Sequence, residues 1–154
     1  MLQVLIVICV ILLDQGTKYM AQSYLKFMPY ESLPVIKDVF HFTYAQNRGA
    51  AFSILQNQRW LFITVTIIAV IFIIYFLIKH PKEEMILKIS LSLILAGAVG
   101  NLIDRIGYGY VIDFLDFRLI NFAVFNVADS AVVIGSILLG YYLLFISDKV
   151  KDSL

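Results

Sequence analysis

Several ionisable side chains stand at the ends of long apolar runs in this sequence. Asp129 lies near the start of one run with no basic residue beside it, and Asp113 lies between Ile112 and Phe114. A charged group inside a membrane costs about 2.5–3.5 kcal/mol on insertion scales, so it is usually retained for pairing or function. Two carboxylates brought together in apolar surroundings share a proton, because both cannot ionise easily. Such a pair suits activation of water for attack on an amide.

Simpler roles are open to the same two residues. Asp129 can cap the N-terminus of a helix, where a carboxylate satisfies free backbone amides. Asp113 can be a residue of a surface loop. The residue types alone do not decide between these roles and the catalytic one.

Other polar residues have partners within reach along the chain. Asp14 and Lys18 are four positions apart on one helix face and can neutralise each other. Asn101, Asp104 and Arg105 share a face of another helix, and Asp104 and Arg105 can neutralise each other although adjacent positions point apart.

The composition indicates a membrane protein. Of 154 residues, 61% are hydrophobic and 15% charged, whereas soluble domains are about half apolar and a quarter charged. The net charge of +1 gives no electrostatic footprint for nucleic acid. The single cysteine, Cys9, excludes an intrachain disulfide, and its apolar neighbours predict a small buried side chain.

Four segments are long and apolar enough to cross a bilayer, at about residues 2–22, 60–78, 85–106 and 127–146. The first lacks a basic stretch before it and a small-residue cleavage site, so we read it as a retained helix and not a secretory signal. An even number of spans places both termini on one side. The lysines in the connection at 80–84 and in the tail at 149–151 lie close to helix ends and favour the cytoplasm for that side, although longer segments on the other side also carry basic residues. The chain is expected to form a single domain over residues 1–154.

Two outer segments join the spans. Residues 23–59 contain the helix breakers Pro29 and Pro34, then an alternating strand pattern over residues 39–44. A return strand at residues 50–55, after a turn at 46–49, would complete a hairpin on the membrane surface. Residues 107–126 begin with a flexible turn and are then rich in aromatic side chains.

Small residues predict close helix packing at two pairs, Ala96 with Gly100 and Ser136 with Gly140. The polar groups of the first, third and fourth spans and of residues 107–126 all fall at the outer membrane face. A ring of polar groups that opens onto a hydrophobic bundle describes a site for an amphipathic substrate.

Five motifs in this order resemble those of the lipoprotein signal peptidase (signal peptidase II) family, which are bacterial membrane aspartic peptidases. Each motif alone is weak, but the ordered set covers nearly the whole chain. The residue before Asn47 is Gln46, where the family commonly has a basic residue. The motifs are Asp14-Gln15-Gly16-Thr17-Lys18, Asn47-Arg48-Gly49-Ala50-Ala51-Phe52, Gly100-Asn101-Leu102-Ile103-Asp104-Arg105, Val111-Ile112-Asp113-Phe114 and Phe125-Asn126-Val127-Ala128-Asp129-Ser130.

The resemblance implies a fold, an activity and a role for each matched residue. It implies an all-α membrane protein of four transmembrane helices with a small β-sheet cradle on the outer face. Asp113 and Asp129 would be the catalytic pair, and no metal or cofactor is expected. The residues that bind substrate or support the site would be Asp14, Lys18, Asn47, Gly49, Asn101, Asp104, Arg105, Asn126 and Ala128.

The resemblance also implies partners and a location. The substrates would be diacylglyceryl-modified prolipoproteins, cut just before the modified cysteine, in contact with membrane lipids. The protein would be a monomer in the bacterial cytoplasmic membrane, with its active site at the outer face.

Two other function classes follow from the residues. A small transporter or ion relay would use Asp14, Asp104 and Asp129, and predicts polar residues through the membrane depth. A metal-dependent membrane phosphotransferase would bind Mg²⁺ between Asp113 and Asp116, and a chelator would separate it from an aspartic peptidase.

Overall fold

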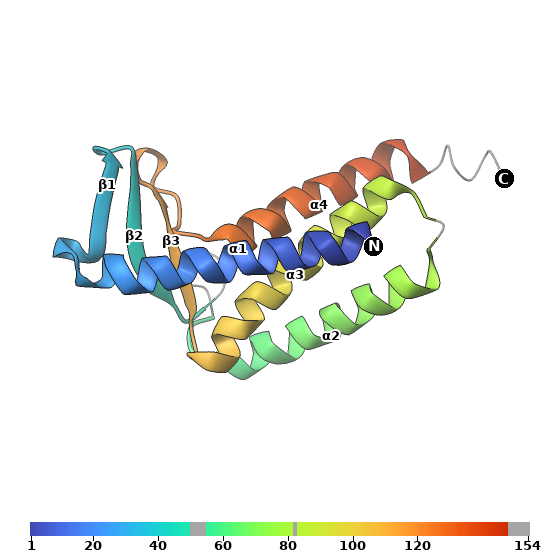
Figure 1. The fold of residues 1–154 in the computed structure, drawn as a ribbon, viewed down its shortest axis with the longest axis horizontal. Coiled ribbons are helices and arrows are strands. Elements are labelled where there is room, and N and C mark those ends of the chain that lie inside the picture. Colours follow the sequence, from blue (N-terminus) through green and yellow to red (C-terminus); the bar gives the residue numbers. More distant parts are fainter. Residues whose placement is uncertain (50–54, 82, 148–154) are drawn as a thin grey trace.

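The computed structural model describes residues 1–49, 55–81 and 83–147. Long helices form a bundle, and a sheet covers one end of it with strands that run across the helix axes (Figure 1). The helices are α1 (Leu2–Tyr24), α2 (Arg59–Lys79), α3 (Met85–Gly107) and α4 (Val127–Phe145); the strands are β1 (Ser32–Ile36), β2 (Phe40–Asn47) and β3 (Val111–Phe117). Short 3-10 turns occupy Leu25–Phe27, Pro29–Glu31 and Arg118–Ile120.

The four predicted spans each coincide with one of these helices. Within the described residues, four helices are long and apolar enough to cross a membrane. The most apolar is α2, yet side chains such as Ile68 and Phe72 are more than 60% exposed. Apolar side chains that face outward along a whole helix are stable only where lipid replaces water.

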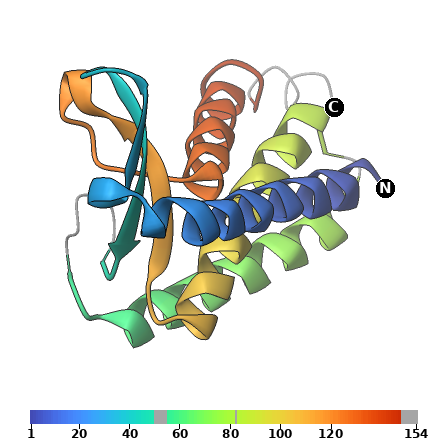
Figure 2. The same ribbon diagram turned by 60° about the vertical axis from the view of Figure 1, so that its left-hand side comes forward.

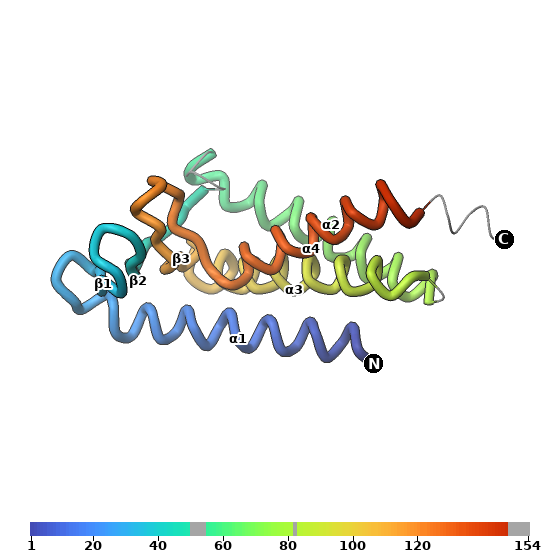
Figure 3. The backbone as a smooth tube through the Cα atoms, turned by 90° about the horizontal axis from the view of Figure 1, so that it is seen from above, coloured from blue at the N-terminus to red at the C-terminus, as the bar shows by residue number. Residues whose placement is uncertain are grey.

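Helix α3 is the centre of the bundle and packs against α1, α2 and α4 (Figure 3). Small residues permit this closeness: Ala96 is fully buried, and a Cβ on Gly97 would collide with the carbonyl oxygen of Ala128 at the start of α4. A Cβ on Gly100 would lie 2.6 Å from Asp14 Oδ2 of α1. The predicted close packing at Ala96 and Gly100 is therefore confirmed.

The second predicted small-residue contact is wrong. A Cβ on Gly140 would meet nothing within 4 Å, whereas one on Gly135 would lie 2.7 Å from Ser90 O of α3. The contact face of α4 is therefore displaced from the Ser136–Gly140 pair, because helix rotation is set by the whole interface and not by spacing alone.

The buried stripe of α1 is polar. Asp14, Lys18 and Ala21 are buried at helical spacing, while most of the apolar residues of this helix face outward. Cys9 is exposed, so its predicted burial is wrong. In lipid the apolar face points away from the protein, and the face that packs inward is free to carry charge.

The strands form one antiparallel sheet in the order β1-β2-β3. The predicted strand at 39–44 is confirmed, but it extends to Asn47, so Gln46 and Asn47 belong to the strand and not to a turn. Its partners are β1, which contains Pro34, and β3 from the second outer segment. Residues 50–54 of the predicted return strand lie outside the described residues, and Leu55 is in a turn.

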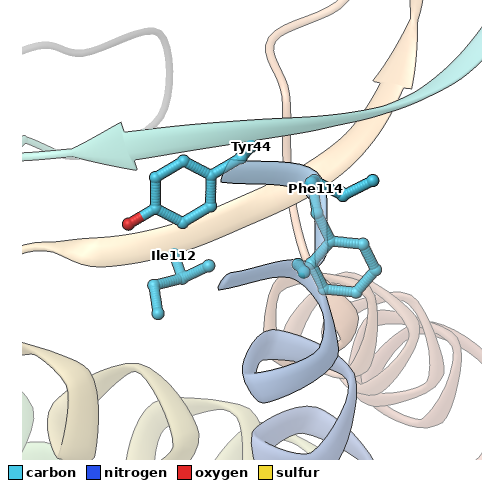
Figure 4. Close-up of a cluster of buried hydrophobic side chains, with 5 residues drawn as sticks. Tyr44, Ile112 and Phe114 are labelled. Atoms are coloured by element: carbon cyan, nitrogen blue, oxygen red, sulfur yellow. The ribbon is translucent and has the colours of Figure 1, made fainter. Parts of the chain in front are cut away.

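One face of the sheet is held by a hydrophobic cluster at the end of α1. Tyr44, Ile112 and Phe114 pack with Ala21 and Leu25 (Figure 4). Figure 2 shows the sheet against this end of the helix. Because successive residues of a strand alternate between faces, Asp113 points to the opposite face from its buried neighbours.

Candidate active site

Asp113 lies within β3 and is 2% exposed, which excludes the alternative that it is a surface loop residue. Each carboxylate oxygen accepts a hydrogen bond from an amide side chain. Asn126 Nδ2 donates to Oδ1 at 2.7 Å, and Asn47 Nδ2 donates to Oδ2 at 3.0 Å. The side chain is therefore fixed from both sides and stays next to the start of α4.

Asp129 lies in the first turn of α4. Its Oδ1 accepts from Asn101 Nδ2 at 2.7 Å, and its Oδ2 accepts from the backbone amide of Asn126 at 3.2 Å. The N-cap residue is Asn126, whose Oδ1 accepts from the backbone amide of Asp129 at 2.8 Å. The predicted cap at Asp129 is thus replaced by a reciprocal capping box, in which Asp129 supplies the returning carboxylate.

Asn126 connects the two carboxylates. It is fully buried and contacts Asp113 through its side chain and Asp129 through its backbone amide. Its Nδ2 also lies 3.2 Å from Asn101 Oδ1. One residue thus sets the position of both acids relative to the helix N-terminus, where backbone amides favour negative charge.

A buried charge cluster lies behind this pair. Lys18 Nζ contacts Asp14 Oδ2 at 2.8 Å, Asp104 Oδ2 at 3.0 Å and Asn101 Oδ1 at 2.9 Å. An ammonium group has three N–H donors, so Lys18 is saturated. The predicted Asp14–Lys18 pair is confirmed, whereas the predicted neutralisation of Asp104 by Arg105 is wrong, because Asp104 pairs with Lys18.

The cluster also fixes the backbone of the segments that carry the acids. Ala128, which is fully buried, donates its amide to Asp14 Oδ1 at 2.9 Å. The amide of Ile112 donates to Asp104 Oδ2 at 3.0 Å. These two amides immediately precede Asp129 and Asp113 in the chain, so the cluster holds both acids in register.

Gln15 has a role that the sequence reasoning missed. Its Nε2 lies 3.1 Å from Asp14 Oδ2, 3.1 Å from Gly100 O and 3.0 Å from Asp104 Oδ1. The residue stands inside the first motif, and that position was the available signal.

A largely apolar cavity of about 620 Å³ opens beside Asp129. Asn47, Asn101 and Arg105 reach it from β2 and α3, whereas Asp14, Lys18, Asp104, Asn126 and Ala128 support it from outside its lining. The segment before α4, of which the motifs included only Phe125, forms a further wall. The apolar lining consists of Val111, Phe122, Ala123, Val124, Phe125, Val132, Val133 and Ile134.

The remaining predicted residues lie at the edge of this cavity. Arg105 Nη2 donates to the carbonyl oxygen of Gly49 at 3.2 Å, and its guanidinium lies 5.0 Å from the ring centroid of Phe62. The Gly49 amide donates to Asn47 Oδ1 at 2.9 Å. Gln46, the residue that departs from the family pattern, donates to the hydroxyl of Tyr44 at 3.2 Å.

Burial raises the pKa of Asp113 from an ordinary 3.8 to about 7. Repulsion from the nearby Asp129 carboxylate also raises this pKa, while the hydrogen bonds from Asn47 and Asn126 oppose the shift. Asp113 therefore holds a proton at a pH where an exposed aspartate has lost it. Among the described residues there is no group of three or more His, Cys, Asp or Glu side chains placed to hold a metal ion.

The family model for signal peptidase (SPase) II matches residues 6–145. The chain belongs to this family. It is 53% identical over 142 residues to the lipoprotein signal peptidase of Caldanaerobacter subterraneus, which covers 92% of this chain and 95% of that protein. The lipoprotein signal peptidase of Clostridioides difficile is 44% identical over 149 residues, covering 97% and 99%.

A solved structure described as a bacterial membrane enzyme, determined by the in meso method, has a TM-score of 0.85 and 38% identity, covering 92% of this chain and 87% of its own. As a member of the signal peptidase II family, the protein is a membrane aspartic peptidase and a multi-pass bacterial membrane protein. These similarities give no support to the transporter alternative.

Proposed function

We propose that this chain removes signal peptides from prolipoproteins by cutting before a diacylglyceryl-modified cysteine, with Asp113 and Asp129 as the catalytic pair. The observation that carries the proposal is the bridge through Asn126, which holds the buried Asp113 next to Asp129, an acid that lines an apolar cavity. The names of the relatives support the substrate class.

The chemistry requires the pair to hold one proton. The ionised carboxylate takes a proton from water, and the water oxygen attacks the scissile carbonyl carbon while the protonated partner gives its proton to the carbonyl oxygen. As the resulting diol collapses, one of its hydroxyl groups gives a proton to the ionised acid. The C–N bond breaks and the leaving amine takes a proton from the other acid, so the pair again holds one proton. The raised pKa of Asp113 favours retention of the shared proton at neutral pH, and which acid acts first is a property of the pair.

The surrounding residues divide into two groups in this proposal. Asn101 and Arg105 line the cavity and supply polar contacts to the substrate backbone or lipid head group. Asp14, Lys18 and Asp104 keep the acids in place through Asn101, Ala128 and Ile112. Asn47 and Gly49 fix the outer edge of the site, and the fully buried Asn126 and Ala128 fix its floor.

We further propose that the protein is a monomeric single domain with the sheet and active site at the outer face of the cytoplasmic membrane and both termini in the cytoplasm. This orientation places the acids where water and a membrane-held peptide bond meet. The substrate's signal helix and acyl chains would arrive laterally from the lipid.

The test is cleavage of a diacylglyceryl-modified prolipoprotein by the purified protein in detergent. Asp113→Asn and Asp129→Asn should each abolish cleavage, while circular dichroism shows a folded protein. Asp116→Asn is the matched control: Asp116 is also buried on β3 but bonds to Thr43 and Arg118, so cleavage should persist. Full activity in either of the first two variants contradicts the assignment, and loss of cleavage with EDTA would favour the metal-dependent alternative.

A further inference from the structure

A second cavity lies at the other end of the helix bundle from the catalytic pair. Its volume is about 460 Å³, and it lies between the C-terminal halves of α2 and α4 over the N-terminal half of α3. Most of its walls are apolar. Glu83 is the carboxylate among the described residues of its lining, and the hydroxyl of Tyr142 donates to Glu83 Oε2 at 3.4 Å. The cavity lining is Phe72, Ile73, Phe76, Glu83, Leu87, Leu91, Leu139, Tyr142, Leu143 and Ser147.

The two cavities lie along the same face of α3. Leu87 and Leu91 line the second cavity, and Asn101 and Arg105, each 14 positions further on, line the first. Fourteen residues make close to four helical turns, so these side chains project from one side of the helix.

Helix α4 repeats this arrangement. Asp129 and Val133 line the first cavity. Leu143, 14 positions after Asp129, lines the second, as does Ser147 just beyond the end of the helix. Figure 1 shows α2 and α4 on either side of α3. We use the name signal-peptide groove for the two cavities together with the faces of α3 and α4 that lie between them.

We infer that this groove binds the helical apolar region of the signal peptide, and that Glu83 binds the basic region that precedes it. The inference rests on the proposed function, because it concerns the substrate of the same site. A signal peptide has a positively charged n-region followed by about 7–15 apolar residues, which as a helix span about 10–22 Å. The 13 positions from Asp129 to Tyr142 correspond to about 20 Å of α4.

The charges at the far end of the groove fit a cationic ligand. Glu83 is held at the rim by Tyr142, and its other oxygen lies 3.9 Å from His80 Nδ1. Lys88 lies on a different side of α3, where it donates to the carbonyl oxygen of Pro81 and lines a third cavity. In the proposed orientation Glu83 is at the cytoplasmic end, where the n-region of a signal peptide also lies.

The third cavity provides an internal comparison. Its volume is about 630 Å³, and it lies between α1 and α2 with Leu77, Lys88 and Leu95 in its lining. Its volume is close to that of the first cavity and its lining is also mostly apolar, but the charged side chain among its described lining residues is the cation Lys88. A basic n-region would be repelled there, and its lining shares no residue with the first cavity.

Photo-crosslinking distinguishes the two apolar surfaces. p-Benzoylphenylalanine is placed at Leu139 in the groove or at Leu77 in the third cavity, in an Asp129→Asn background that leaves the substrate uncut. We expect an adduct between position 139 and the apolar region of a diacylglyceryl-modified prolipoprotein, at least five times more abundant than at position 77. Equal adducts at both positions, or adducts at position 139 with membrane lipid alone, overturn the inference.

A charge reversal tests Glu83 by kinetics with the active protein. Glu83→Lys should raise KM about tenfold for a substrate with a basic n-region, leave kcat unchanged, and regain the wild-type KM with an acidic n-region. Glu84→Lys is the matched control, since Glu84 is the exposed neighbour outside the cavity lining, and its KM should change less than twofold.

A short diacylglyceryl peptide without an n-region separates the two possible failures. Wild type and Glu83→Lys should cleave it equally. If wild type cleaves neither substrate, the proposed function fails. If wild type cleaves both and Glu83→Lys has an unchanged KM for the basic substrate, the inference about Glu83 fails while the proposed function stands.

Discussion

Replacement of Asp113 by asparagine should change how the stability of the protein depends on pH. Burial raises the pKa of Asp113 to about 7, whereas the unfolded chain has a value near 3.8. Between these values the folded state holds a proton that the unfolded state has lost, so the free energy of unfolding falls as pH rises. About three pKa units at 1.36 kcal/mol each give a total loss of about 4 kcal/mol, which begins near pH 4 and levels off above pH 7.

Asp113→Asn removes this dependence because the amide does not ionise. Asn47 and Asn126 each donate to one carboxylate oxygen, so one of them loses its acceptor in the variant. That loss costs about 1–3 kcal/mol and is the same at every pH. The variant should therefore be less stable than wild type near pH 4 and approach or exceed it near pH 8.

The measurement is reversible unfolding in mixed micelles, followed by circular dichroism from pH 4 to pH 8. The difference between variant and wild type at each pH reports Asp113 together with its coupling to Asp129, because groups that do not interact with Asp113 contribute equally to both proteins. A difference that stays constant over this range would refute the raised pKa and, with it, the reasoning that this acid retains the shared proton.

Three further predictions concern activity and packing. The value of kcat/KM should fall as pH rises through about 7, because the pair loses its shared proton near the raised pKa of Asp113. A kcat/KM that stays constant up to about pH 9 would contradict this assignment of the shared proton. Lys18→Met should lower the free energy of unfolding by about 3–5 kcal/mol in denaturant titration, because it leaves Asp14 and Asp104 buried without their cation. A decrease of less than about 1 kcal/mol would mean that the charge cluster does not stabilise the fold. Gly97→Ala should unfold or displace α4 and lower the melting temperature, because its Cβ would collide with the carbonyl oxygen of Ala128. Gly140→Ala is the control: its Cβ meets no neighbour, so it should leave the melting temperature unchanged or slightly raised. Equal melting temperatures for the two variants would show that the α3–α4 contact yields.

The helices could be predicted from the sequence because lipid makes hydropathy a direct signal. A backbone that crosses a bilayer must satisfy its own hydrogen bonds, so about twenty apolar residues give a helix with little influence from the rest of the chain. The ordered motifs likewise place Asp14, Lys18, Asn101, Asp104 and Asp129 in one set of candidate site residues.

The sheet is where the sequence was least informative. Pairing in a sheet joins segments distant in the chain: Asn47 of β2 pairs with Val111 of β3, 64 positions later. The alternating pattern identified β2, but no local feature showed that its partners are β1 and β3. Pro34 in β1 weakened the strand signal, although proline is tolerated on an edge strand.

The partners of each charge were also decided by the tertiary structure. The sequence determined that Asp113 and Asp129 are costly residues at the membrane boundary, and the spacing of Asp14 and Lys18 determined their pairing. Only the folded chain decided that the cation paired with Asp104 is Lys18 and not Arg105, and that Asn126 bridges the two acids. Spacing along one helix predicts contacts on that helix. Contacts between α1, α3, β3 and α4 depend instead on how these elements cross. Close packing at Gly97 and Gly100 helps to set that crossing.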